Sequence, residues 1–146
     1  RPTIGIFTNI GGAHISGFTS IEEKAREKAT LLAGCDTVIY CADNTLISSV
    51  IPEVAHRIGW SAKAPDAPLF ISRIDKKGDS TEIAYNYLSG KTSGSFTIPF
   101  TSDHDIENAI HCLALSLALG LGAGDKTVRR GDLTTNTPEA IPRTYR

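Results

Sequence analysis

Two short apolar segments on either side of an amphipathic helix constrain the fold of this chain most strongly. The segments Thr3–Phe7 and Thr37–Ala42 have the length and the β-branched composition of buried strands. Between them, Ser20 and Glu23 form a capping box that predicts a helix starting directly after Ser20, and Gly34 is a natural stop for it. Strand, helix and strand within about 40 residues make a βαβ unit, so we expect the two strands to be parallel.

The chain then changes from helical to strand-like character and back. We expect a helix over Asn44–Ile58, despite Pro52 in its middle, followed by a loop. A second amphipathic helix is expected over Asp103–Leu119, capped by Ser102 or by Asp103 itself. Between the two helices, strand-like runs separated by turn-rich sequences predict an antiparallel meander, with strands at Leu69–Ile74, Thr81–Leu88 and Ser95–Phe100.

These elements predict an α/β fold with a parallel βαβ unit, an antiparallel β meander and packed helices. We expect one domain over residues 1–121 and a polar, basic tail over residues 122–146. The chain has no methionine and begins with Arg1 just before the first strand, which is what a piece of a longer protein would show.

Charge and cysteine content exclude several classes of partner. The net charge of -1 favours neither nucleic acids nor anionic membranes, and no apolar run is long enough to cross a bilayer. The three cysteines have no metal-ligand spacing, so we expect reduced thiols in a cytoplasmic protein, packed as small core residues: Cys35, Cys41 and Cys112.

A lysine on an apolar helix stripe is the first candidate site residue. Ile21, Ala25, Lys28 and Leu32 recur at spacings of four, three and four, so Lys28 lies where a leucine would be expected. Lys28 could extend its amine to water along a packed stem. Alternatively, desolvation would lower its pKa and make the amine nucleophilic or reactive toward carbon dioxide.

The loop after the first strand is the second candidate. Gly11 and Gly12 let the backbone approach a ligand, and His14 is a plausible metal ligand at the carboxyl end of a parallel strand. An ordinary loop histidine is the alternative, and the turn before the helix would bring His14 and Lys28 near each other.

Three polar residues share one face of the expected second helix: His104, Asn108 and His111. For His111 we expect a solvent-facing role. His104 and Asn108 lie in or near the first turn, which suits anions such as phosphate, and Asn108 could also bond a nucleotide base. The sequence at Ser89–Ser93 lacks the upstream glycine of a phosphate-binding loop, so we interpret it as a hairpin turn.

Three motifs together resemble the Mur ligases, the ATP-dependent enzymes that build the peptide of peptidoglycan. They are TNIGGAHISGFTSIEEKAREK (8–28), VIYCADN (38–44) and FTSDHDIENAIHCLALSLALGL (100–121). The GF-S segment after His14 and the spacing to Lys28 are most similar to the branch that adds D-alanyl-D-alanine to the UDP-N-acetylmuramoyl tripeptide.

The resemblance implies roles for individual residues. His14 would ligate Mg²⁺, and Lys28 would be a carbamylated lysine whose carboxylate helps to hold the metal. Asn108 would contact the adenine of ATP, with His104 and Asp105 in the same nucleotide-binding motif. Asn9 and Asp43 would lie near the cleft. In the parent enzyme the partners would be the UDP-muramoyl peptide, D-alanyl-D-alanine and the other domains of the chain.

Departures from the family pattern limit what this chain is expected to do alone. The phosphate-binding loop, the N-terminal UDP-binding domain and most of the C-terminal domain are absent, and Asp105 stands where the motif has its first asparagine. We therefore expect an inactive fragment of the central domain, with an exposed sheet edge that favours self-association. Whether the parent protein is fused to an alanine racemase is left open.

Two alternatives remain. The chain could be a non-catalytic α/β binding or interaction module that keeps the fold without the chemistry. A carbamyl-lysine metal hydrolase ranks last, because it would need several more metal ligands than His14 and the scattered other histidines supply.

Overall fold

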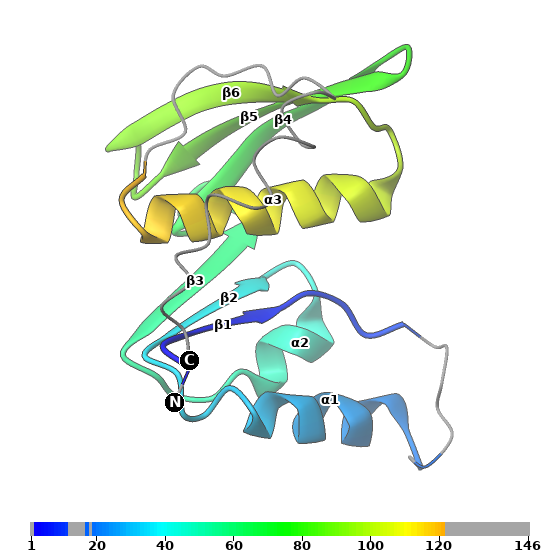
Figure 1. Cartoon of the computed structure of the whole chain (residues 1–146), viewed down its shortest axis with the longest axis vertical. Coiled ribbons are helices and arrows are strands. Elements are labelled where there is room, and N and C mark those ends of the chain that lie inside the picture. The colour runs from blue at the N-terminus through cyan, green and yellow to red at the C-terminus, as the bar shows by residue number, and fades with distance from the viewer. Residues whose placement is uncertain (1, 12–16, 18, 122–146) are drawn as a thin grey trace, which may run out of the picture.

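The computed structural model describes residues 2–11, 17 and 19–121 (Figure 1). Within them the strands form one sheet whose spatial order follows the chain: β1 (Ile4–Phe7), β2 (Thr37–Cys41), β3 (His56–Ser61), β4 (Leu69–Lys77), β5 (Ser80–Tyr87) and β6 (Thr92–Ile98). Strands β1 to β4 pair in parallel, and β4 to β6 pair antiparallel. The predicted α/β architecture, a parallel βαβ unit continued by an antiparallel meander, is therefore confirmed.

Helices cover both faces of this sheet (Figure 1). Helices α1 (Ile21–Thr30) and α2 (Thr45–Val50) lie on one face and enclose a small core with β1 and β2. Helix α3 (Asp103–Ala118) lies on the other face and packs on a larger core that extends from β2 to β6. Alternate residues of β2 enter both cores: Val38 faces α1 and α2, whereas Ile39 faces α3, and both are fully buried.

Helix α1 begins where the capping box predicts. The Ser20 hydroxyl accepts a hydrogen bond from the Glu23 backbone N–H at 3.1 Å. The Glu23 carboxylate accepts from the backbone N–H of Thr19 at 2.7 Å and from its hydroxyl, one residue earlier than an ideal capping box. These two bonds from Thr19 lower the pKa of Glu23.

The helix predicted over Asn44–Ile58 is largely wrong. Asn44 caps a helix of only six residues by accepting from the Ile47 backbone N–H at 3.1 Å. Ile51 is already extended, because a residue that precedes a proline is disfavoured in the helical region, and Pro52 follows it. The chain then forms β3, a third parallel strand that the sequence analysis did not predict.

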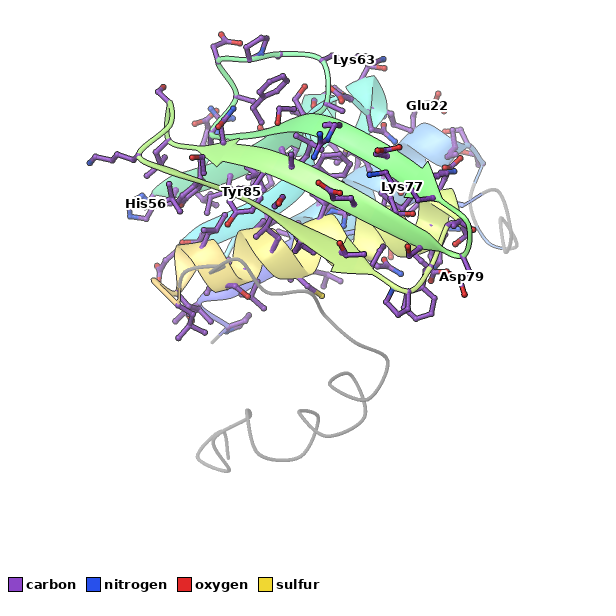
Figure 2. The ribbon with its side chains drawn as sticks, turned by 90° about the horizontal axis from the view of Figure 1, so that it is seen from above. Glu22, His56, Lys63, Lys77, Asp79 and Tyr85 are labelled. Carbon is purple, nitrogen blue, oxygen red and sulfur yellow. The ribbon has the colours of Figure 1, made fainter. Side chains whose placement is uncertain are left out.

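The meander is as predicted, with β4 extended to Lys77 and β6 beginning earlier, at Thr92. The β5–β6 turn falls at Leu88–Gly90, where all three residues have positive φ, so the hairpin interpretation of this lysine-containing stretch is confirmed. Figure 2 shows Lys77 and Asp79 at the tip of the β4–β5 hairpin, and Tyr85 between the strands and α3, where it is 1% exposed.

The cysteines are free, as expected, but they do not share one environment. Cys35 and Cys41 are buried, and burial raises the pKa of the Cys41 thiol. Cys112 is exposed, contrary to the core position predicted for it. Across the described ranges, no helix has the length and apolar character to cross a membrane.

Candidate functional site

The carboxyl ends of β1, β2 and β3 lie along one edge of the sheet, where ligands bind in parallel α/β proteins (Figure 1). The segment after β1, Thr8–Gly11, leads toward His14 and contains Asn9, which is exposed. Asp43 follows β2, and the 62–68 loop follows β3. His14 and Gly12 lie outside the described residues, so the predicted metal ligand cannot be placed.

The buried lysine of α1 is Lys24, not Lys28. Lys24 is only 7% exposed, and its Nζ donates to the Gly11 backbone carbonyl at 3.3 Å. Lys28 lies in the last helical turn and is exposed, which agrees with the interpretation that its amine extends to water and not with the desolvated alternative. The two lysines are one turn apart on the same stripe, and the segment that follows β1 contacts Lys24 through the Gly11 carbonyl. The metal-binding role of Lys28 stays a prediction.

Asp43 joins the ends of β2 and β3. Its Oδ1 accepts from the Ser61 hydroxyl at 2.5 Å, and its Oδ2 accepts from the Ala62 backbone N–H at 2.8 Å. The same hydroxyl oxygen accepts from the backbone N–H groups of Lys63 at 3.0 Å and Ala64 at 2.8 Å. Asp43 therefore orders the loop after β3, and both of its carboxylate oxygens are engaged in doing so.

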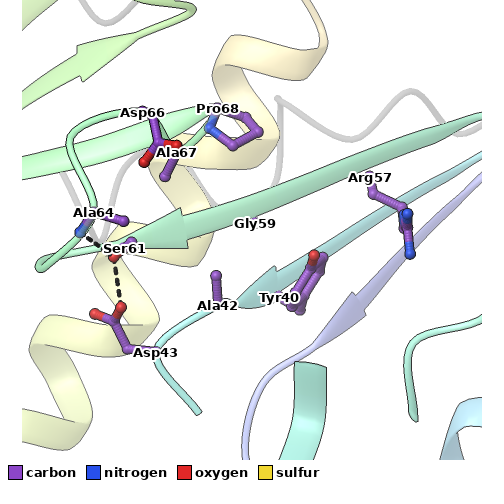
Figure 3. A pocket seen from close by; sticks show the side chains of 10 residues that line it. All are labelled: Tyr40, Ala42, Asp43, Arg57, Gly59, Ser61, Ala64, Asp66, Ala67 and Pro68. Atoms are coloured by element: carbon purple, nitrogen blue, oxygen red, sulfur yellow. Dashed lines mark hydrogen bonds between the residues drawn. The ribbon is translucent and has the colours of Figure 1, made fainter. Parts of the chain in front are cut away.

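A groove of about 470 Å³ opens beside this network (Figure 3). Its floor includes Ala42 and Gly59, and a Cβ built on Gly59 would come within 3.1 Å of the Tyr40 ring. Arg57 and Asp66 carry charges on its rim, and Arg57 is paired with Glu53 at 3.2 Å outside the groove lining. Asp43 is part of this lining, while its place near the expected ligand cleft stays a prediction.

The N-terminus of α3 does not favour an anion. The Ser102 hydroxyl caps it by accepting from the Asp105 backbone N–H at 3.1 Å, and donates to the Asp105 carboxylate at 2.6 Å. Asp103 adds a second carboxylate, whose pKa is lowered by its pairing with Lys76 at 2.8 Å. Two negative charges and a satisfied cap make this turn a poor phosphate site, so the phosphate interpretation is not supported.

His104 and Asn108 do form a pair on the exposed face of α3. The Asn108 amide nitrogen lies 3.2 Å from His104 Nε2. This bond leaves the Asn108 carbonyl oxygen and one amide hydrogen for a planar partner such as a nucleotide base. The arrangement therefore suits the predicted base contact, although it does not test it.

His111 is buried, so the solvent-facing role predicted for it is wrong. It is 3% exposed, its ring meets Trp60 edge to face at 5.6 Å, and its Nε2 lies 3.2 Å from the indole Nε1. Because an indole N–H only donates, Nε2 must accept and the imidazole proton is on Nδ1. Nδ1 lies near the backbone carbonyls of Glu107 and Phe7 but has no hydrogen-bond partner in the described part of the chain.

Residues 2–11, 17 and 19–121 hold no group of three or more His, Cys, Asp and Glu side chains that could bind a metal.

A protein-family comparison decides the identity of the fold. The chain matches the Mur ligase middle domain over residues 1–116. This chain belongs to the Mur ligase family. The match runs from β1 through most of α3 and includes all three motifs that carried the resemblance, apart from the last residues of the third.

Curated relatives agree with the family. A UDP-N-acetylmuramate–L-alanine ligase from Nostoc punctiforme is 31% identical over 124 residues, which cover 84% of this chain and 25% of that protein. The enzyme of the same name from Synechocystis is 26% identical over 122 residues, which cover 83% of this chain and 23% of the relative. The Mur ligase chain described here therefore spans about a quarter of the length of these relatives.

Solved Mur ligases have the same fold. A UDP-N-acetylmuramoyl-L-alanyl-D-glutamate–2,6-diaminopimelate ligase aligns with a TM-score of 0.67 at 18% identity, over 81% of this chain and 25% of that one. A MurF ligase from Thermotoga maritima in complex with ADP aligns with a TM-score of 0.64 at 14% identity, over 90% of this chain and 30% of that one.

Sequence reasoning missed Lys24 and Ser61, and it named His111 without its burial. A signal existed for Lys24, because it lies four residues before Lys28 on the same stripe. Trp60 and His111 are 51 residues apart in the chain, and no local pattern joins them.

Proposed function

We propose that this chain is part of the central, nucleotide-binding domain of an ATP-dependent ligase that joins an amino acid or dipeptide to a UDP-N-acetylmuramoyl precursor in the cytoplasm. The family match over residues 1–116 carries this proposal. The carboxyl edge of the parallel strands supports it, because it presents polar groups on Asn9, Asp43 and the base-binding pair of His104 and Asn108.

The chain's own residues have distinct tasks in this proposal. Mg-ATP, when bound, supplies the phosphoryl group that activates the muramoyl carboxylate for attack by the incoming amine. Asn108, held by His104, offers its amide to the adenine. His14 and a carbamylated Lys28 contribute metal ligands, and Asp105 remains in the helix cap. The proposed domain covers residues 1–121, and residues 122–146 connect onward.

We propose D-alanyl-D-alanine as the amine substrate, because the GF-S segment and the fourteen-residue spacing from His14 to Lys28 resemble the branch that uses it. L-alanine is a second candidate, because the 31% identical relative is named as an L-alanine ligase. The two differ in both substrates, since the first acts on a UDP-muramoyl tripeptide and the second on UDP-N-acetylmuramate itself.

The test is ADP release by the full-length protein that contains this chain, with ATP, Mg²⁺ and each substrate pair in turn. We expect turnover with the tripeptide and D-alanyl-D-alanine. Turnover only with UDP-N-acetylmuramate and L-alanine would select the second candidate, and no turnover with either pair would favour a non-catalytic module. The isolated 146-residue chain is expected to be inactive.

Lys28→Ala tests the metal-ligand role. We expect turnover to fall by at least about 100-fold, because a group that stabilises developing charge is lost, with little change in melting temperature since Lys28 is exposed. Arg26→Ala, an exposed cation on the same helix, is the matched control and should retain activity. Equal turnover in the two variants would remove Lys28 from the mechanism.

A further inference from the structure

Lys24 stands out among the charged residues that the structure describes. Within residues 2–11, 17 and 19–121 it is the only Lys, Arg, Asp or Glu that is buried, at 7% exposed. A long lysine stem normally lets the ammonium reach water, whereas the Lys24 side chain is packed and its ammonium makes a part-buried contact. Withdrawing a charge from water is unfavourable unless the protein supplies partners. A partly buried ammonium at this position therefore requires an explanation.

The position of its ammonium supplies one. Nζ donates to the backbone carbonyl of Gly11, 13 residues earlier in the chain and four residues beyond the end of β1. The neighbouring Ile10 is 8% exposed and belongs to the same small core as Ala25 and Ala29 of α1. The segment that follows β1 is thus attached to α1 by the apolar contacts of Ile10 and by a charged hydrogen bond to the Gly11 carbonyl.

We propose that Lys24 is a positioning residue that fixes the Thr8–Gly11 segment at the carboxyl edge of the sheet. This segment carries the exposed Asn9, so its path sets where the Asn9 amide can meet a nucleotide or metal. The expected effect on turnover rests on the proposed ligase function, whereas the structural constraint on Thr8–Gly11 does not.

A cation explains this contact better than an apolar residue would. Ile10 already supplies apolar contact to the segment, and the Lys24 ammonium adds a charged donor to the carbonyl of the exposed Gly11. A charged donor makes a hydrogen bond about twice as strong as a neutral one, and its four-carbon stem reaches from the helix to the loop. Desolvation of the Lys24 ammonium lowers the stability of the folded protein, whereas its hydrogen bond orders the segment at the edge of the site.

Amide hydrogen exchange tests the constraint without any assay of activity. In the full-length protein, Lys24→Met keeps the stem and removes the donor. We expect exchange at Thr8–Gly11 to rise roughly tenfold, the scale of one lost charged hydrogen bond, while exchange in β2 stays unchanged. Arg26→Met on the same helix is the matched control, and Lys24→Arg should restore slow exchange because it keeps a charged donor.

The melting temperature distinguishes a positioning role of Lys24 from a general contribution to the stability of the fold. Replacing a buried charge with an apolar group of similar length is often neutral or stabilising, so Lys24→Met should melt no lower than Arg26→Met. If ligase turnover is found, Lys24→Met should lower kcat about tenfold or more and raise the Mg²⁺ concentration for half-maximal rate, the usual scale for residues that orient a metal site.

The outcomes are distinct. Unchanged exchange at Thr8–Gly11 in Lys24→Met would overturn the proposal, as would uniform acceleration of exchange across the whole domain with a lowered melting temperature. If Lys24→Met does not fold, Lys24→Leu, which also lacks a donor, carries the same exchange test. Absence of ligase activity in the wild type would end the proposed function, while the exchange result would still decide the role of Lys24.

Discussion

The pair formed by His111 and Trp60 links α3 to β3 through one buried hydrogen bond. Burial lowers the pKa of His111, and the nearby carbonyls of Glu107 and Phe7 act in the opposite direction with less effect. Protonation would put a second proton on Nε2, which would break the bond from the indole N–H and leave a charged ring in the core. The folded protein therefore favours neutral His111.

This preference predicts acid-sensitive stability. In the unfolded chain His111 gains a proton below its ordinary pKa of about 6.5, whereas in the folded protein it resists protonation to lower pH. The free energy of unfolding should thus decrease as pH falls below about 6.5 and level off beneath the folded-state pKa. His111→Gln should flatten this decrease in urea titrations, whereas the exposed His56→Gln should leave it intact. Equal slopes in both variants would contradict the prediction.

Residue roles were predictable from the sequence only as far as they are local. The Ser20 cap and the His104–Asn108 pair follow from spacing along one helix, and both are present. The choice between Lys24 and Lys28 depends on which turn of α1 the chain segment after β1 covers, and helical periodicity is identical for the two. Burial of His111 depends on Trp60, a long-range partner.

At the scale of single elements, hydrophobic periodicity failed to predict β3. The His56–Ser61 segment is buried only at its last four residues, so it lacks a clean alternation and continues the apolar spacing of α2. Pro52 was the decisive signal, because it ends α2 and leaves the chain extended. The elements with strong local signals, β1, α1, β2 and the two hairpins, were all predictable.

The junction of β2 and β3 predicts the effect of losing one carboxylate. Asp43→Ala removes the acceptors of the Ser61 hydroxyl and the Ala62 N–H, and should lower the free energy of unfolding by about 1–3 kcal/mol. Asp43→Asn keeps one acceptor oxygen, so its free energy of unfolding should lie between those of the wild type and Asp43→Ala. Asp66→Ala removes an exposed carboxylate from the loop that Asp43 orders, and should change stability by no more than about 0.5 kcal/mol in urea unfolding. Comparable losses in the alanine variants would refute the bracing role of Asp43.

At the scale of the whole molecule, the sheet separates two cores of unequal size. The parallel half lies between α1, α2 and α3, while the antiparallel half has α3 on one face and no described helix on the other, as Figure 1 shows. The class of fold was predictable because strand, helix and turn signals agree along the chain. The placement of α3 across β2 to β6 was not, since it follows from long-range packing that no segment encodes alone.

The two cores should nevertheless unfold together, because neighbouring residues of β2 belong to different cores and share one backbone. Ile47, in the smaller core, and Ile110, in the larger, are 1% and 0% exposed. Replacing either with alanine should lower the free energy of unfolding by about 2–5 kcal/mol. Trp60 is the chain's single tryptophan and reports only on the larger core. In Ile47→Ala, the urea midpoint from Trp60 fluorescence should therefore shift as far as the midpoint from far-ultraviolet circular dichroism. An early circular-dichroism transition that leaves Trp60 fluorescence unmoved would mean that the α1–α2 side unfolds independently, and that β2 does not couple the two faces of the sheet.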